Sequence, residues 1–322
     1  MNIDNINALI KPELEALHLR MKREMRSDVA LLNLITDYLL KSKGKQMRPM
    51  LVFLSAKICG NTTDATIVAA TMIELLHTAT LVHDDVVDEA DTRRGLLSIN
   101  AKWKNKAAVL LGDFMLSRGL LISLESNQYE LLQIMSNAVK EMSEGELLQI
   151  DKAMKLDIDE DVYYDIISKK TASLIKTACL AGCHSVSDDK NMQEKMAEIG
   201  YNIGMAFQIK DDLMDLGKDA IGKPLAIDIK EQKMTLPLIY TLRNVSFIEK
   251  TKLIALIRFR NTNKNSIQTI IEAIYNNGGI AYSEKKMYEF ANKAKDILSS
   301  FEENQYREAL MSLIDYTVSR KK

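Results

Sequence analysis

The most informative segment of the chain reads Leu75-Leu-His77-Thr-Ala79-Thr80-Leu-Val-His83-Asp84-Asp85-Val-Val-Asp88-Glu-Ala-Asp-Thr-Arg93-Arg94-Gly95. It begins apolar and ends in a cluster of carboxylates followed by two arginines. In a helix, Asp84 and Asp88 share one face, whereas Asp85 points about 100° away. Adjacent like charges repel unless a cation lies between them. A cluster of carboxylate oxygens therefore favours a hard divalent cation, magnesium above all.

The spacing Asp-Asp-x-x-Asp occurs a second time, at Asp211-Asp212-Leu-Met-Asp215, again after an apolar helical stretch. A charge run on a helix is usually a solvated face, and one copy alone would not exclude that interpretation. Two copies in a chain of ordinary composition favour a pair of cation sites. Neither copy has the glycine and the terminal glutamate of a calcium loop, which excludes that motif.

Composition places the chain among globular proteins. It has 322 residues, of which 47% are hydrophobic and 27% charged, with a net charge of −1. That balance gives no indication of nucleic-acid binding. Three cysteines are too few for a disulfide framework and fit a reducing compartment. We expect no signal peptide and no transmembrane segment, because no run approaches about 18 uncharged apolar residues. The expected location is the cytoplasm.

The distribution of proline predicts an all-α chain. Prolines occur only at positions 12, 49, 224 and 237, which leaves 50–223 free of the strongest helix breaker. With no linker in evidence, residues 1–322 are expected to form a single all-α domain. The expected helices are 3–26, 28–41, one from Pro49 to Gly60, a long one capped within 61–64, 106–125, 128–153, 160–181, 189–216 and several after 234. Helix 106–125 is apolar on nearly every face, and 217–233 is expected to form an active-site loop.

These motifs resemble the trans-prenyltransferases of the polyprenyl diphosphate synthase family, most of all its long-chain, octaprenyl-type members. The resemblance extends from Gly44-Lys45-Gln-Met-Arg48-Pro49 through both aspartate motifs to Lys233-Met-Thr235-Leu-Pro237. It implies a helical bundle of the isoprenoid synthase type around a central apolar cavity. It also implies a homodimer that condenses isopentenyl diphosphate repeatedly onto an allylic diphosphate such as farnesyl diphosphate.

The resemblance also implies a role for each candidate residue. Asp84, Asp88 and Asp211 would hold magnesium, three ions per active site by family expectation, with Asp85, Asp212 and Asp215 in support. The cations expected on the allylic diphosphate are Arg93, Lys170, Lys223 and Lys233. Those expected on isopentenyl diphosphate are Lys45, Arg48, His77 and Arg94. Thr171 and Gln208 would face the carbocation, and pyrophosphate would take the final proton.

Three positions depart from the family pattern. Gln46 stands where arginine is frequent, and Ala226 and Gln232 stand where glycine is frequent. None of the three removes an expected ligand. Ala226 and Gln232 are expected to stiffen the loop 217–233.

The helix before Asp84 indicates the length of the product. Ala79 and Thr80 lie roughly 6–8 Å upstream of Asp84 along a helix, where short-chain relatives have aromatic bulk, so a product of roughly C35 to C50 is expected. Farther back, Leu76 and Ile73 would form an apolar wall, with helix 106–125 opposite. The tunnel is expected to close near residues 120–124.

Several alternatives are weighed against this interpretation. A short-chain farnesyl or geranylgeranyl diphosphate synthase has the same motifs, and a terpene cyclase has the same fold but would lack the second motif. A regulatory subunit of a heteromeric synthase would be expected to have lost motif residues. His83-Asp84 also matches the metal phosphohydrolases, which need more ligating histidines than His18, His77 and His184 offer. A greasy product would bring the protein transiently to a membrane surface.

Overall fold

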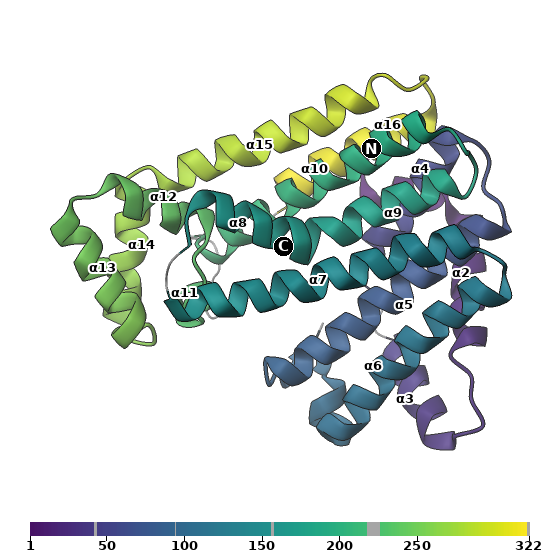
Figure 1. Cartoon of the computed structure of the whole chain (residues 1–322), viewed down its shortest axis with the longest axis horizontal. Coiled ribbons are helices and arrows are strands. Elements are labelled where there is room, and N and C mark those ends of the chain that lie inside the picture. The colour runs from purple at the N-terminus through teal and green to yellow at the C-terminus, as the bar shows by residue number, and fades with distance from the viewer. Residues whose placement is uncertain (42–43, 94, 156–157, 218–225, 321–322) are drawn as a thin grey trace. The chain divides into compact units, whose positions relative to one another are not determined.

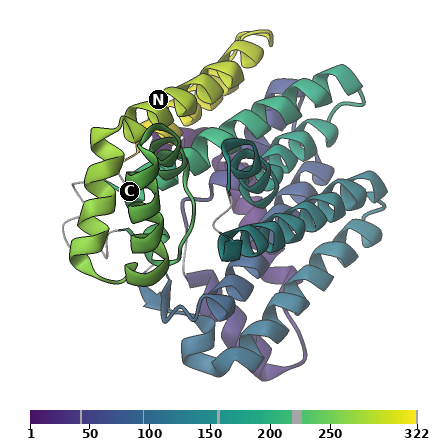
Figure 2. The same ribbon diagram turned by 60° about the vertical axis from the view of Figure 1, so that its left-hand side comes forward.

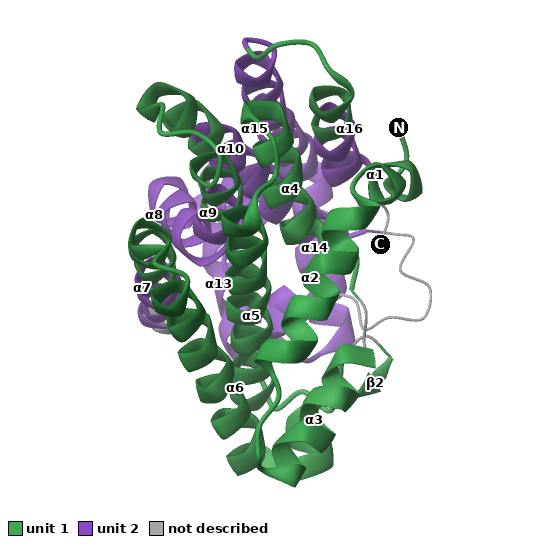
Figure 3. Ribbon diagram, turned by 90° about the vertical axis from the view of Figure 1, so that its right-hand side faces the viewer, with its two compact units in different colours: residues 1–139, 177–197, 301–310 green, residues 140–176, 198–300, 311–322 purple. Residues whose placement is uncertain are grey.

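The computed structural model describes residues 1–41, 44–93, 95–155, 158–217 and 226–320, with the side chains of 154 and 155 left aside. Two compact units make up the chain, and each contains several separate stretches of sequence (Figure 3). Unit 1 comprises 1–139, 177–197 and 301–310, and unit 2 comprises 140–176, 198–300 and 311–322. That the whole chain forms one domain stays a prediction.

Unit 1 contains the N-terminal helices, of which α2 to α6 are labelled in Figure 1, and one short hairpin, whose strand β2 is labelled in Figure 3. Its helices are α1 (Ile3–Leu9), α2 (Lys11–Glu24), α3 (Ala30–Lys41), α4 (Met47–Cys59), α5 (Asp64–Val87) and α6 (Ile99–Glu125). The antiparallel hairpin pairs β1 (Thr92–Arg93) with β2 (Leu96–Leu97).

Unit 2 contains most of the C-terminal half. It includes α8 (Glu160–Ile167), the π-helical turn η1 (Ser168–Ala172), α11 (Ile227–Lys230), α12 (Leu236–Asn244), α13 (Phe247–Arg260), α14 (Lys264–Asn276) and α15 (Gly279–Leu298). Both units share α7 (Tyr129–Lys155), α9 (Ser173–His184), α10 (Lys190–Asp215) and α16 (Gln305–Ser319). The all-α prediction is thus confirmed.

Local sequence signals account for most helix ends. Thr63 begins α5 with a capping box shared with Thr66, and Gly60 ends α4, both as expected. The predicted helix 3–26 is instead two helices. Pro12 stands in the first turn of α2, where it has no N–H to give to a continuous helix and its ring crowds the preceding turn. In α6, Lys104 has a non-helical φ of 72°, and the part after it corresponds to the expected helix 106–125.

Helix α5 forms the centre of the unit 1 core and packs against α2, α4 and α6. Ile73 and Leu75 on α5, Phe53 on α4 and Met115 on α6 are fully buried. Each such side chain contributes about 1.5–3 kcal/mol by leaving water. This packing holds the first aspartate motif, at the end of α5, on a rigid support.

Two helices, α5 and α6, are long and apolar enough by composition to cross a membrane, with a mean hydropathy of 1.6 over 18 residues. Every such window of α5 contains Glu74 and every one of α6 contains Asp113, so neither helix has a run of 18 uncharged residues. The α5 window is 61% buried inside the structure and the α6 window 33%. Core helices of soluble proteins meet the same criterion, so composition alone does not place either helix in a bilayer.

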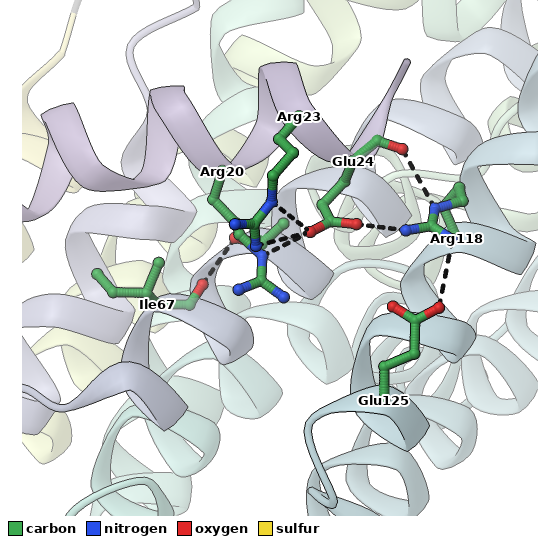
Figure 4. Close-up of polar contacts among 7 residues, drawn as sticks. Arg20, Arg23, Glu24, Ile67, Arg118 and Glu125 are labelled. Atoms are coloured by element: carbon green, nitrogen blue, oxygen red, sulfur yellow. Dashed lines mark hydrogen bonds and ion pairs between the residues drawn. The ribbon is translucent and has the colours of Figure 1, made fainter. Parts of the chain in front are cut away.

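A buried carboxylate, Glu24, ties α2 to α6 within unit 1 (Figure 4). Its Oε1 lies 2.7 Å from Arg20 Nε and 3.2 Å from Arg23 Nη2, and its Oε2 pairs with Arg118 of α6. Arg118 Nε also donates to the Glu24 carbonyl oxygen at 3.2 Å. Burial raises the pKa of Glu24, but the three guanidinium groups outweigh it and hold that pKa below its usual value.

Candidate active site

The first aspartate motif occupies the last turn of α5. Asp84 and Asp88 are exposed, whereas Asp85 is only 2% exposed. This division follows from helix geometry, because residues four apart share a face and the intervening Asp85 turns toward the interior. These two carboxylates therefore face solvent.

Asp85 is instead paired inside unit 1. Arg93 Nε, on β1, donates to Asp85 Oδ1 at 2.6 Å, and Asn100 Nδ2 donates to the Asp85 carbonyl oxygen at 3.0 Å. Burial raises the pKa of Asp85, and the Arg93 charge opposes that rise. Arg93, expected on the allylic diphosphate, thus has a carboxylate partner that fixes the hairpin to α5. Its neighbour Arg94 lies outside the described residues.

The expected isopentenyl diphosphate cations come together at the start of α4. Arg48 Nη1 lies 2.9 Å from His77 Nε2 of α5. Arginine can only donate, so His77 Nε2 accepts and the ring proton is assigned to Nδ1. Lys45 precedes α4 and is exposed. Two of the four predicted cations are therefore neighbours, and a third lies three residues from Arg48 in the sequence.

Lys170 and Thr171 lie on η1, within unit 2. A π-helical turn adds one residue to a helix and is frequent at functional sites. Here it lies close to two glycines, since a Cβ on Gly145 would lie 2.7 Å from the Lys170 nitrogen, and one on Gly204 would lie 2.5 Å from Ala172 Cα. Lys170 Nζ lies 2.5 Å from Glu146 Oε2 and 3.3 Å from Gln149 Oε1.

A polar chain connects Thr171 to the second aspartate motif. Thr171 Oγ1 donates to Gln208 Oε1 at 2.7 Å, and Gln208 Nε2 donates to Asp212 Oδ1 at 2.9 Å. The Tyr163 hydroxyl donates to Asp212 Oδ2 at 2.7 Å. Asp212 is 5% exposed. Burial, with the charge of Asp228 adding to it, raises the pKa of Asp212 to about 7.

Asp215 binds the start of α11, which makes part of the expected loop 217–233 helical. Its two carboxylate oxygens accept the backbone N–H groups of Ile227 (3.1 Å) and Asp228 (3.0 Å), at the start of α11. Burial and the Asp215 charge raise the pKa of Asp228 to about 6. Lys233 Nζ lies 2.5 Å from Glu231 Oε2 and 3.8 Å from Asp228 Oδ1. Residues 218–225 of this expected loop, with Lys223, lie outside the described residues.

The backbone conformation explains why glycine is frequent in the family at the positions of Ala226 and Gln232. Ala226 and Gln232 both have a φ of +58°. That left-handed conformation is natural for glycine and unfavourable for other residues. The family's preference for glycine at these positions, noted from the sequence, is therefore a preference for this turn.

Asp211 has a partner that sequence reasoning missed. Arg320 Nη2 donates to Asp211 Oδ1 at 2.5 Å and to the Phe207 carbonyl oxygen at 3.3 Å. Its guanidinium also lies 3.9 Å from the centre of the Phe207 ring. A single arginine 109 positions from Asp211 carries no local signal in the sequence. Tyr163, Glu146 and Asp228 were missed for the same reason.

An apolar cavity of about 210 Å³ lies within unit 1. It is lined by Met72 and Leu76 (α5), Met115, Leu116, Gly119 and Leu120 (α6), and Met135, Ser136 and Val139 (α7). Leu76 and residues of α6 line this cavity, and their role as walls of a product tunnel stays a prediction. Ala79 and Ile73 are fully buried and are not among the lining residues, and the Thr80 hydroxyl donates to the His77 carbonyl oxygen at 2.8 Å.

The carboxylates differ in how well they suit a divalent cation. Asp84 and Asp88 are exposed and Asp211 is partly exposed. Asp85, Asp211, Asp212 and Asp215 each accept a hydrogen bond from another side chain or from the backbone. Among the described residues, no three His, Cys, Asp or Glu side chains could hold a metal ion by themselves. The donor set therefore fits magnesium, which keeps waters and takes substrate phosphate oxygens as ligands. His83, the start of the alternative phosphohydrolase motif, packs against α6, 3.2 Å from the Val109 carbonyl oxygen.

Comparison with known proteins identifies the class. The polyprenyl synthetase family model matches residues 29–274. The octaprenyl diphosphate synthase of Escherichia coli (strain K12) is 34% identical over 327 residues, which cover 99% of each chain. A crystal structure of polyprenyl synthase from Caulobacter crescentus CB15, complexed with calcium and isoprenyl diphosphate, has a TM-score of 0.91 and 32% identity over 100% of this chain and 98% of its own. A geranylgeranyl pyrophosphate synthase from Bacteroides thetaiotaomicron has a TM-score of 0.84 and 34% identity over 98% of each chain.

The helical fold and the two aspartate motifs are those of an isoprenyl diphosphate synthase, and such enzymes are trans-prenyltransferases. The chain belongs to the polyprenyl synthetase family.

Proposed function

We propose that this protein is a long-chain polyprenyl diphosphate synthase that adds isopentenyl diphosphate repeatedly to farnesyl diphosphate, giving an all-trans product of roughly C35 to C50. The observation that carries the proposal is a stripe on α5. Leu76 and Met72 lie 8 and 12 residues before Asp84, within about 120° of helix circumference, with the outward carboxylate at one end and the cavity-lining side chains at the other. A diphosphate bound at Asp84 would thus have an apolar path for its tail.

Two separate groups of cationic side chains would bind the diphosphates of the two substrates. Lys45, Arg48 and His77 would bind the diphosphate of isopentenyl diphosphate, with the Arg48 fork suited to two phosphate oxygens. Lys170 and Lys233 would bind the allylic diphosphate, each leaving the carboxylate that holds it now. Divalent cations, held by Asp84 and Asp88 of unit 1 and by Asp211 of unit 2, would offset the charge of the leaving diphosphate. Roles for Arg94 and Lys223 rest on resemblance alone.

Thr171 and Gln208 would stabilise the allylic cation through the oxygens of their side chains. Their mutual hydrogen bond, continued to Asp212 and Tyr163, fixes both side chains before substrate arrives. The departing diphosphate can take the final proton, so the reaction does not need a side chain as the base.

The assembly and the cellular location are also proposals. Helix α6 has exposed apolar side chains at Val109, Leu110, Leu120, Leu121 and Leu124. Such a row supports a homodimer that buries this face. We expect the dimer in the cytoplasm.

Metal removal and two substitutions test the function. Chelation should abolish incorporation of labelled isopentenyl diphosphate, and magnesium should restore it. Asp84→Ala and Asp211→Ala should each lower kcat by about 10²–10³-fold, because each removes charge stabilisation of the leaving group. Asp296→Ala, a control far along the sequence on α15, should retain wild-type turnover. Near-normal turnover in Asp211→Ala would contradict the role of the second motif.

A further inference from the structure

Helix α13 has two apolar faces, and one of them is exposed. Leu253 and Ile257 are buried against unit 2, where α13 packs beside α14 and α12 (Figures 1 and 2). On the opposite side Phe247 is 83% exposed, Ile248 82% and Phe259 76%. These are the three most exposed bulky apolar side chains among the described residues. Exposing bulky apolar side chains to water is unfavourable in free energy, which indicates that a partner covers them.

The three side chains form one stripe. At 100° per residue, Phe247, Ile248 and Phe259 fall within about 120° of helix circumference, an arc that also holds Thr251, Ala255 and Arg258. The stripe runs the full length of α13, because Phe247 begins the helix and Phe259 is its penultimate residue. A helix lying flat on a surface would bring all three into contact at once.

Positive charge flanks the stripe. Lys252 lies about 20° beyond one edge of the stripe and Arg258 about 20° inside the other, while Lys250 and Arg260 lie farther round. The helix has one carboxylate, Glu249. All four cations are exposed, and among the described residues none of them makes an ion pair. The helix is thus strongly basic in a chain whose net charge is −1. Apolar side chains bordered by lysine and arginine are typical of helices that lie in an anionic membrane surface.

Size and arrangement favour a lipid surface over other partners. A helix of 14 residues is about 21 Å long and about 10 Å wide, so this face covers roughly 200 Å². A stable protein interface needs about 800 Å² from each partner. A nucleic-acid site would place cations centrally on the phosphates, whereas here the centre is apolar and the cations lie at the edges.

We propose that α13 is a membrane-docking helix that lies in the surface of a bilayer containing anionic lipid. Phe247, Ile248 and Phe259 enter the boundary of the acyl chains, and Lys252 and Arg258 contact the headgroups. The docking rests on α13 alone. Only its use, the delivery of a highly apolar product to the bilayer, rests on the proposed function.

Vesicle sedimentation with the full-length protein tests the proposal. The wild type should pellet at least about tenfold more strongly with phosphatidylcholine vesicles containing about 30% phosphatidylglycerol than with phosphatidylcholine alone, and high salt should weaken the binding. The double variant Phe247→Ser/Phe259→Ser should lose about tenfold of the binding. Lys252→Ala/Arg258→Ala should lose the preference for anionic vesicles.

A matched control replaces exposed apolar residues elsewhere. Leu19→Ser/Tyr288→Ser alters side chains that are 69% and 50% exposed and should bind as the wild type does. Circular dichroism and incorporation of isopentenyl diphosphate in detergent, measured for every variant, separate docking from folding and from catalysis. No binding by the wild type, equal binding to neutral vesicles, or equal loss in the control would overturn the proposal, even if the enzyme is fully active.

Discussion

At the scale of single residues, the partner of Asp211 is the most consequential contact. Arg320 presents a positive charge to a carboxylate that is proposed to hold a divalent cation. The two cations compete for the same oxygens, so the arginine must withdraw before the metal can bind there. Arg320 is positioned for this by the Phe207 ring and carbonyl group.

We therefore expect Arg320→Ala to bind magnesium about fivefold more tightly, which corresponds to roughly 1 kcal/mol for the lost ion pair. Calorimetric titration of magnesium in the presence of an inert diphosphate analogue measures this affinity. Arg320→Lys keeps the charge and serves as the control, with affinity near that of the wild type. An unchanged affinity in Arg320→Ala would show that the pair does not oppose the metal.

The buried Asp212 predicts a dependence of stability on pH. Its pKa is raised to about 7 in the folded protein against 3.8 normally, so the fold favours the protonated form. The stabilisation it gives is present at low pH and is lost as pH rises through about 7. Asp228, with its pKa raised to about 6, acts in the same direction.

In EDTA, the free energy of unfolding of the wild type should fall relative to that of Asp212→Asn between roughly pH 4 and 8, by about 1–4 kcal/mol. Urea denaturation at each pH gives the two curves. Parallel curves would mean that Asp212 titrates normally in the folded protein.

At the scale of elements, the Glu24 cluster holds α2 to α6. Glu24→Gln leaves three guanidinium groups around an uncharged amide and should destabilise the protein by about 2–4 kcal/mol. Glu125→Gln is the matched control, because that carboxylate contacts the same Arg118 but its side chain is 55% exposed, and it should cost about 0.5 kcal/mol or less. Equal costs in the two variants, measured by urea denaturation, would contradict a role for burial.

Elements were predictable where the signal is local. Gly60 predicts where α4 ends, and Thr63 predicts where α5 begins. Helical periodicity predicts that the Asp85 side chain points inward. The π-helical turn was not predictable, since it depends on the close approach of Gly145 and Gly204 from two other helices. The break between α1 and α2 at Ile10 was predictable from Pro12, because proline favours the first turn of a helix over its interior.

At the scale of the whole molecule, motif order identified the family, and the polyprenyl synthetase match confirms it. The partners that adjust the motif residues could not be read from sequence. Arg320, Tyr163 and Glu146 reach their partners only after distant helices pack. The aspartates were therefore recognisable, but which of them accept protein hydrogen bonds was not.

Chain length is the least local property of all, because several helices shape the cavity. The structure shifts attention from Ala79, which is fully buried, to Thr80, which shares a face with Asp84 and Leu76. Thr80→Phe should place a ring in the path and shorten the product, and Ala79→Phe, the substitution suggested by sequence, provides the comparison. Initial incorporation of the first isopentenyl unit should persist in Thr80→Phe.

The product of the wild-type enzyme is the most direct test of the central claim. Purified protein is incubated with magnesium, farnesyl diphosphate and an excess of labelled isopentenyl diphosphate, and the lipid products are resolved by mass spectrometry. The apolar path along α5 from Asp84 to Met72 is at least about 18 Å long, which predicts products of roughly C35 to C50. Thr80→Phe should end near C15 or C20 in the same assay. A wild type that itself stops at C15 or C20 would contradict the assignment as a long-chain synthase.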